Sequence, residues 1–180
     1  MRAVCIPVCV IAGLASSYAF VAEPAWLDVP FVQQTKAGCG AAAVAMVIGY
    51  WARQFRELSA AATASERIRE LLPVSSVKGI QGEALKRYLD AHGFQSFVFN
   101  GELVDLRQHL AKGRPLIVCF APAGIKAPLH YAVVVGLDER SVWLNDPARG
   151  KLSREDRHRF VSEWRETGGW TLLAVPRQQN

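Results

Sequence analysis

The sequence lacks the patterns that build metal centres and disulfide frameworks. It has four cysteines, with no C-x-x-C pair, and its histidines form no H-x-x-x-H pair, so no zinc site is predicted. Cys5 and Cys9 lie in an apolar stretch at the N-terminus. The other two cysteines are too few for a disulfide scaffold. We expect no metal ion and no organic cofactor, and Cys39 and Cys119 need another explanation.

Blocks of like charge are also absent. The 21 basic and 16 acidic residues, with a net charge of +5, are interspersed along the chain. The most highly charged segment, residues 154–159, is typical of a solvated helix face. Nucleic-acid binding is therefore not expected. No repeat, low-complexity tract or linker is present, and 180 residues suit one domain.

A long apolar run lies at the very start of the chain. Arg2 supplies a positive charge, residues 3–14 are apolar and uncharged, and residues 17–19 place small side chains where a signal peptidase reads them. The run is too short to span a bilayer reliably. We therefore expect a secretory signal over 1–19 and a single exported domain over 20–180, periplasmic or secreted. A retained N-terminal anchor is the alternative, and it would be the chain's only membrane contact.

The order of the predicted elements indicates an α+β fold. Helices are expected over 40–51, 60–72, 82–92 and 102–112, the first of them apolar on every face. Strand-like runs follow at 116–120, 131–135, 142–144 and 170–175. A further helix is expected to begin at Ser153, with Asp156 as its capping-box partner. Helices first and strands later predict an α+β domain with an antiparallel sheet.

Cys39 is the candidate nucleophile. It lies between Gly38 and Gly40, where a polar loop enters the first, buried helix. Free N–H groups and the helix dipole stabilise a thiolate there, and flanking glycines let a substrate backbone approach. A small buried core residue is the alternative interpretation. Cys119, in an apolar strand, is interpreted as core, although an oxidising compartment would also allow a Cys39–Cys119 disulfide.

His130 and Asp146 are the candidate partners of this thiol. His130 opens a strongly apolar strand, where a titratable ring needs partners. Asp146 ends the next strand, so a hairpin would bring it to His130 as an orienting acceptor. Asn145 is the second candidate for this orienting role.

A glutamine precedes the candidate nucleophile by six residues. Gln33 lies in the loop before Cys39, with Gln34 beside it. A side-chain amide in this place can donate an N–H to an oxyanion, together with the backbone N–H of the cysteine. A solvated loop glutamine is the alternative.

Four stretches combine these features in the order Gln, Cys, His, Asp: residues 28–33 (DVPFVQ), 38–42 (GCGAA), 129–134 (LHYAVV) and 145–147 (NDP). With them the chain resembles the double-glycine-leader, or bacteriocin-processing, cysteine peptidases. The resemblance implies a papain-like fold, with the nucleophile at the N-terminus of a buried central helix packed on an antiparallel sheet. It assigns Gln33 to the oxyanion hole, Cys39 to attack, His130 to proton transfer and Asp146 to orientation.

The chain also departs from many members of that family. It carries no transporter segment or nucleotide-binding motif, and Gly38 stands where transporter-linked members usually carry Asp. It is therefore more similar to a stand-alone, exported branch, for which we expect hydrolysis of peptides or small proteins. Two other hypotheses remain open: a cell-wall amidase or endopeptidase, and a non-catalytic papain-like domain that binds peptides.

Overall fold

The computed structural model describes residues 25–35, 38–55, 65–72, 74–75, 79–122 and 129–177. The expected signal segment, residues 1–19, lies outside these ranges. An antiparallel seven-stranded sheet forms the centre of the fold, with β1 (Ala25–Trp26) paired to β6. Its main path runs β4 (Phe94–Asn100), β9 (Trp170–Pro176), β5 (Leu116–Phe120), β6 (His130–Leu137), β7 (Ser141–Asp146) and β8 (Gly150–Asp156). A separate pair joins β2 (Val74–Ser75) to β3 (Gly79–Ile80).

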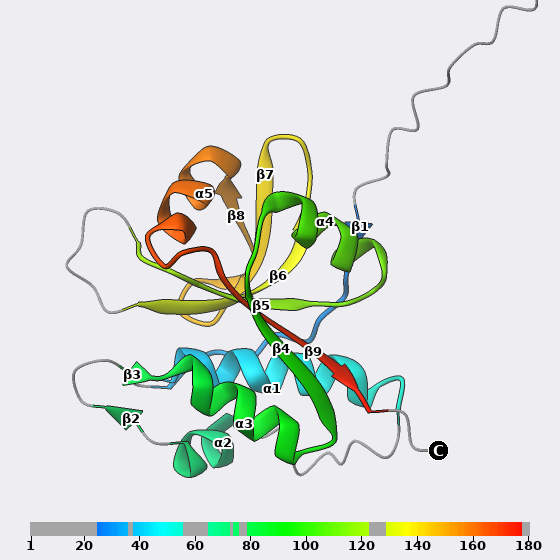
Figure 1. Ribbon diagram of the computed structural model, residues 1–180, viewed down its shortest axis with the longest axis vertical. Helices are drawn as coiled ribbons and strands as arrows, with labels where there is room; N and C mark the ends of the chain where they lie inside the picture. Colours follow the sequence, from blue (N-terminus) through cyan, green and yellow to red (C-terminus); the bar gives the residue numbers. More distant parts are fainter. Residues whose placement is uncertain are drawn as a thin grey trace, which may run out of the picture.

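Helices cover the central strands on both sides, as Figure 1 shows. One side carries α1 (Cys39–Ala52), α2 (Ser65–Leu71) and α3 (Gly82–Ala91), and the other carries α4 (Leu103–Ala111) and α5 (Arg157–Arg165). Each side has its own apolar cluster. Cys119 of β5 packs in the cluster of α1, whereas its neighbours Val118 and Phe120 pack with α4 and α5. Burial on both faces explains why β5 is apolar at every position.

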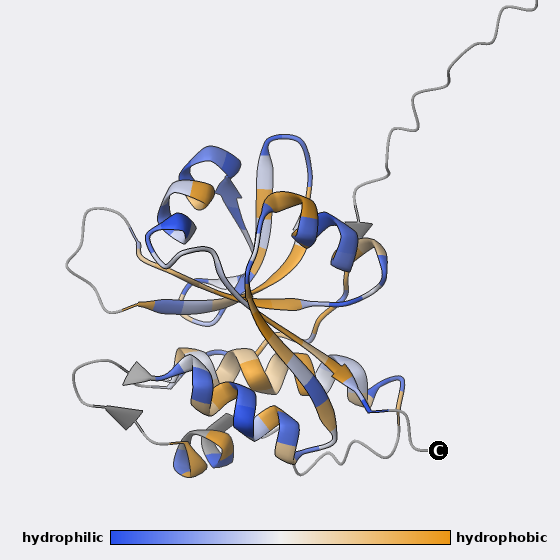
Figure 2. Ribbon diagram, in the orientation of Figure 1, coloured by the Kyte–Doolittle hydropathy of each residue, from blue (hydrophilic) through white to orange (hydrophobic). Residues whose placement is uncertain are grey.

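The first helix confirms the prediction of a buried element. Residues 40–48 of α1 are all buried, and Figure 2 shows α1 as more apolar than α3 and α5. Gly40 lets its first turn lie close to its neighbours. A Cβ at Gly40 would stand 3.1 Å from Leu85 Cδ2 and 3.4 Å from Tyr131 Cδ2. The small residue therefore brings the start of α1 against α3 and β6.

The helix expected from Ser153 was wrong. Ser153 lies in β8, which pairs with β7, and α5 begins only at Arg157. Asp156 is the N-cap itself, because its carboxylate accepts from the N–H groups of His158 at 2.9 Å and Arg159 at 3.0 Å. Residues 154–159 are therefore not one solvated helix face. Strand β4 was also missed, and β4 and β8 are the two ends of the sheet path.

The remaining predicted elements are confirmed within a few residues where the structure describes them. None of the helices in the described ranges combines the length and the apolar character needed to cross a bilayer.

Candidate active site

Cys39 is the first residue of α1 and is partly buried. Gly38 occupies the N-cap without any side-chain hydrogen bond, and the first turn contains no acidic residue. The thiol therefore lies at a helix start whose first N–H groups have no capping side chain. The backbone N–H groups of Tyr131 and Gly40 act as hydrogen-bond donors to its sulfur. The sequence-based prediction of a thiol at a buried helix start is confirmed.

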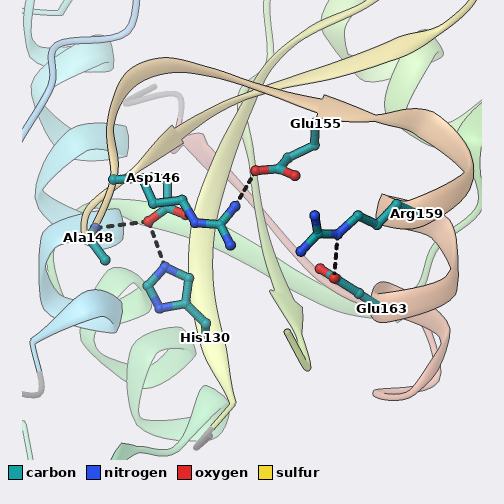
Figure 3. A network of polar contacts seen from close by, with 7 residues as sticks. His130, Asp146, Ala148, Glu155, Arg159 and Glu163 are labelled. Atoms are coloured by element: carbon teal, nitrogen blue, oxygen red, sulfur yellow. Dashed lines mark hydrogen bonds and ion pairs between the residues drawn. The ribbon is translucent and has the colours of Figure 1, made fainter. Parts of the chain in front are cut away.

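His130 and Asp146 meet at one end of the β6–β7 hairpin. The antiparallel register places Val133 opposite Asn145, which brings the start of β6 to the end of β7. His130 Nε2 lies 2.7 Å from Asp146 Oδ1, and their side chains are 15% and 1% exposed. Figure 3 shows this contact, together with the Ala148 N–H that donates to the same oxygen at 2.8 Å. The predicted juxtaposition is confirmed.

The same geometry assigns the two ring nitrogens of His130. Nε2 is engaged by Asp146, which leaves Nδ1 for the hydrogen bond between His130 and the Cys39 thiol. The base is thus held between an acceptor and the sulfur. This is the arrangement by which a carboxylate fixes the tautomer of a catalytic histidine.

The charges of the three groups support one another. Burial alone lowers the pKa of His130, but hydrogen bonds with Asp146 and Cys39 raise it to about 9. Burial raises the pKa of Cys39, but His130 and the N–H groups of Tyr131 and Gly40 bring it below its ordinary value. Burial likewise raises the pKa of Asp146, but the hydrogen bond and charge of His130, the Ala148 N–H and the charge of Arg149 together bring it below its ordinary value. All three shifts act in the direction of a thiolate–imidazolium pair beside a carboxylate.

Cys119 lies in the middle of β5, opposite Tyr131 of β6. Burial raises the pKa of its thiol to about 12, despite a hydrogen bond with the Tyr131 side chain. Both cysteines are free thiols in this structure. The interpretation of Cys119 as a core residue is confirmed by its 3% exposure.

The loop that carries Gln33 and Gln34 is hydrogen-bonded to the turn that follows Asp146. The Gln34 backbone N–H donates to the Pro147 carbonyl at 3.0 Å, directly after Asp146. The Gln33 side chain is exposed, whereas Gln34 buries an Oε1 that has no hydrogen-bond partner among the described residues. The role of Gln33 at an oxyanion stays a prediction.

Asn145, the second candidate for orienting the base, is used elsewhere. Its Nδ2 donates to the Val29 carbonyl at 2.9 Å, and its Oδ1 accepts from the Leu152 N–H at 3.1 Å. The side chain is buried and joins β7 to its neighbours. Within the described ranges, no three His, Cys, Asp or Glu side chains form a group suited to a metal ion.

Two charged residues beside the site were not singled out from the sequence. Arg149 Nε lies 3.7 Å from Asp146 Oδ2, and the same guanidinium pairs with Glu155 of β8. Their sequence context, a turn and a charged segment, gave no signal of this contact.

Comparisons with known proteins agree with this geometry. Residues 26–172 match the Peptidase_C39 like family. The chain is 29% identical over 144 residues to the transport/processing ATP-binding protein ComA of Streptococcus pneumoniae, in both the R6 and the TIGR4 strains. The match covers 77% of this chain and only 17% of the length of each relative.

Solved structures share the fold at low sequence identity. A C39-like peptidase from Bacillus anthracis superposes with a TM-score of 0.66 at 18% identity, covering 87% of this chain and 100% of that one. A double glycine motif protease from an AMS/PCAT transporter, solved with its leader peptide, superposes with a TM-score of 0.63 at 21% identity. The match covers 84% of this chain and 94% of that one. The peptidase domain of Streptococcus ComA superposes with a TM-score of 0.63 at 23% identity, covering 82% of this chain and 98% of that one. The predicted papain-like fold is confirmed.

Proposed function

Since the chain belongs to the Peptidase_C39 like family and is a cysteine peptidase, we propose that Cys39, His130 and Asp146 are its catalytic triad. The observation that carries this proposal is the continuous line of contacts at the start of β6. Cys39 hydrogen-bonds to His130, and His130 Nε2 lies 2.7 Å from Asp146 Oδ1. The shifted pKa values of all three groups favour the charged states that such catalysis needs.

The reaction follows from these positions. The Cys39 thiolate attacks the carbonyl carbon of the scissile peptide bond, and His130 gives its Nδ1 proton to the leaving amine as the C–N bond breaks. The acyl group is then bound to sulfur as a thioester. His130, now neutral, takes a proton from water, and the resulting hydroxide attacks the thioester and releases the thiolate. Asp146 keeps the imidazole in place through both steps and stabilises its cationic form.

Gln33 is proposed as the side-chain donor of the oxyanion hole, beside the backbone N–H of Cys39. The support is its place six residues before Cys39, in a loop held to the Asp146 turn through the bond from Gln34 to Pro147. Gln33→Ala should lower kcat by about 10²-fold, the usual loss of one oxyanion donor. Gln34→Ala is the matched control, and an equal loss there would contradict the assignment to Gln33.

The proposed substrates are peptides or small proteins outside the cytoplasm. A leader peptide bound to one structurally similar protease supports the substrate class, and the apolar run of residues 3–14 supports export. Fusion of residues 1–24 to a reporter enzyme active only outside the cytoplasm tests the export proposal. Absence of reporter activity in cells that make the fusion protein would contradict export.

A peptide-library digest read by mass spectrometry tests the activity itself. The wild-type chain should yield a defined set of cleavage products, and Cys39→Ala should yield none. Cys119→Ala, which removes a thiol from the core but leaves the triad, should yield the wild-type set. Identical products from wild type and Cys39→Ala would refute Cys39 as the nucleophile.

A further inference from the structure

The two carboxylate oxygens of Asp146 have unequal surroundings. Oδ1 contacts His130 Nε2 at 2.7 Å and accepts from the Ala148 N–H at 2.8 Å. Oδ2 is buried and has no hydrogen-bond partner among the described residues. The whole side chain is 1% exposed, and a charge buried in this way is costly unless it is compensated. The compensation for Oδ2 is an ion pair with Arg149 Nε at 3.7 Å.

Arg149 is itself held in place from the opposite strand. It lies in the turn between β7 and β8, where its N–H donates to the Asp146 carbonyl at 3.1 Å. Its Nη1 pairs with Oε1 of Glu155, whose side chain is only 11% exposed. The rigid fork of a guanidinium presents donors in two directions at once. Arg149 therefore bridges two buried carboxylates, one at the end of β7 and one in β8.

We propose that Arg149, fixed by Glu155, is a positioning residue that holds the Asp146 carboxylate in its orientation toward His130. This inference rests on the proposed triad and adds a residue that supports Asp146 from behind. With Oδ2 held toward Arg149, the carboxylate cannot rotate about its Cβ–Cγ bond, so Oδ1 stays on His130. The effect reaches the reaction only through Asp146. Loss of Arg149 should therefore lower kcat and leave KM unchanged.

Charged groups on β6, on the β7–β8 turn, on β8 and on α5 lie around the Asp146 carboxylate. His130 of β6 and Arg149 of the turn face Asp146 directly. Glu155 of β8 faces Arg149, and Arg159 of α5 lies near Glu155 while pairing with Glu163 at 2.9 Å. Figure 3 shows Glu155 between the Asp146 contact and the Arg159–Glu163 pair. Removal of Arg149 takes away the cation on Oδ2, so Asp146 should bind a proton at higher pH.

The test uses the full-length chain and a peptide identified in the library digest. Arg149→Gln should lower kcat about tenfold, since small losses of alignment at a catalytic group cost up to 10²-fold. The acid limb of the kcat–pH profile should move to higher pH. Arg149→Lys keeps the positive charge but not the planar guanidinium. Its loss of kcat and its shift of the acid limb should both be smaller than those of Arg149→Gln. The near-isosteric Glu155→Gln should give a smaller loss of kcat in the same direction.

Arg159→Gln is the matched control. Arg159 is half-exposed and pairs with a buried acid, as Arg149 does, but it does not contact Asp146. Wild-type kcat and an unmoved acid limb are expected for it. The proposal is overturned if Arg149→Gln and Glu155→Gln keep wild-type kcat and acid limb, if Arg159→Gln loses as much, or if KM rises in place of the fall in kcat.

Failure of the triad would look different. Cys39→Ala or Asp146→Asn with full cleavage activity would refute the proposed function, whereas their expected losses beside a wild-type Arg149→Gln would refute only the role of Arg149. Thermal unfolding of each variant identifies those that do not fold. If Arg149→Gln is among them, Glu155→Gln and Arg149→Lys decide the question through the same kcat and pH measurements.

Discussion

Two thiols on the same side of the sheet have pKa values shifted in opposite directions. Cys39 and Cys119 both pack against the apolar cluster that α1 forms with β5 and β6, and burial raises the pKa of each. For Cys119 burial dominates, and the pKa reaches about 12. For Cys39 the partners dominate, and the pKa falls below the ordinary value. Position along an element separates them, because only Cys39 stands at a helix start and beside a histidine.

This comparison shows which contacts lower the pKa of a buried cysteine. The apolar surroundings alone would disfavour ionisation of both thiols. The N–H groups of Tyr131 and Gly40 and the imidazolium of His130 offset that cost at Cys39. At Cys119 the contact is a Tyr131 hydroxyl, a neutral group, and the nearby Cys39 charge opposes ionisation.

Alkylation should separate the two thiols most strongly. With iodoacetamide at pH 7, Cys39 in the folded protein should react at least about 10³-fold faster than Cys119, because a thiol with a pKa of about 12 is almost wholly protonated. Peptide mapping by mass spectrometry resolves the two sites, and also Cys5 and Cys9. Comparable rates at Cys39 and Cys119 would remove the basis of the comparison.

Asp146→Asn should make Cys39 more like Cys119. A neutral amide stabilises the imidazolium much less than a carboxylate does, so the His130–Cys39 pair loses its charge support and kcat should fall roughly 10³-fold. The pH at which Cys39 alkylation becomes fast should also rise toward that of an ordinary thiol. Both quantities are measured on the same preparation. An unchanged alkylation profile would mean that the helix start alone activates Cys39.

Alkaline pH should weaken the pair at Cys39 and leave Cys119 unaffected. The pKa of His130 is about 9 in the folded state against 6.5 as its ordinary value. A raised pKa of this kind stabilises the fold fully below pH 6.5, and the contribution is lost as pH rises through 9. Both kcat and the unfolding temperature should therefore decline between pH 7 and 10. Cys39→Ala, which lacks the thiolate, should show a smaller decline in unfolding temperature.

The candidate site could be predicted from the sequence because it combines local signals. Cys39 between two glycines at the start of an apolar helix, and His130 at the start of an apolar strand, each stand out from their neighbours. Asp146 followed because consecutive strands of a hairpin bring such positions together, and the 2.7 Å contact with His130 confirms that geometry. The catalytic roles themselves remain proposals.

What the sequence did not predict lies at the edges of the sheet. Strands β4 and β8 carry polar residues on an open face, so they lack the continuous apolar run that marks β5. The turn residue Arg149 and the strand residue Glu155 meet only because β7 and β8 pair. No local pattern indicates such a contact. With β8 interpreted as a helix start, the support behind Asp146 could not be inferred.

Cys119→Ala should have the smallest effect, confined to stability. The side chain is 3% exposed in the middle of β5, and removal of its sulfur leaves a small cavity beside Tyr131, so the free energy of unfolding should fall by about 1 kcal/mol. Denaturant unfolding measures this loss, and kcat should stay at the wild-type value because no triad contact involves Cys119. Cys39→Ala should show the reverse, with activity abolished and a stability change that depends on pH through His130. A loss of activity in Cys119→Ala at full stability would place the core thiol within the active site.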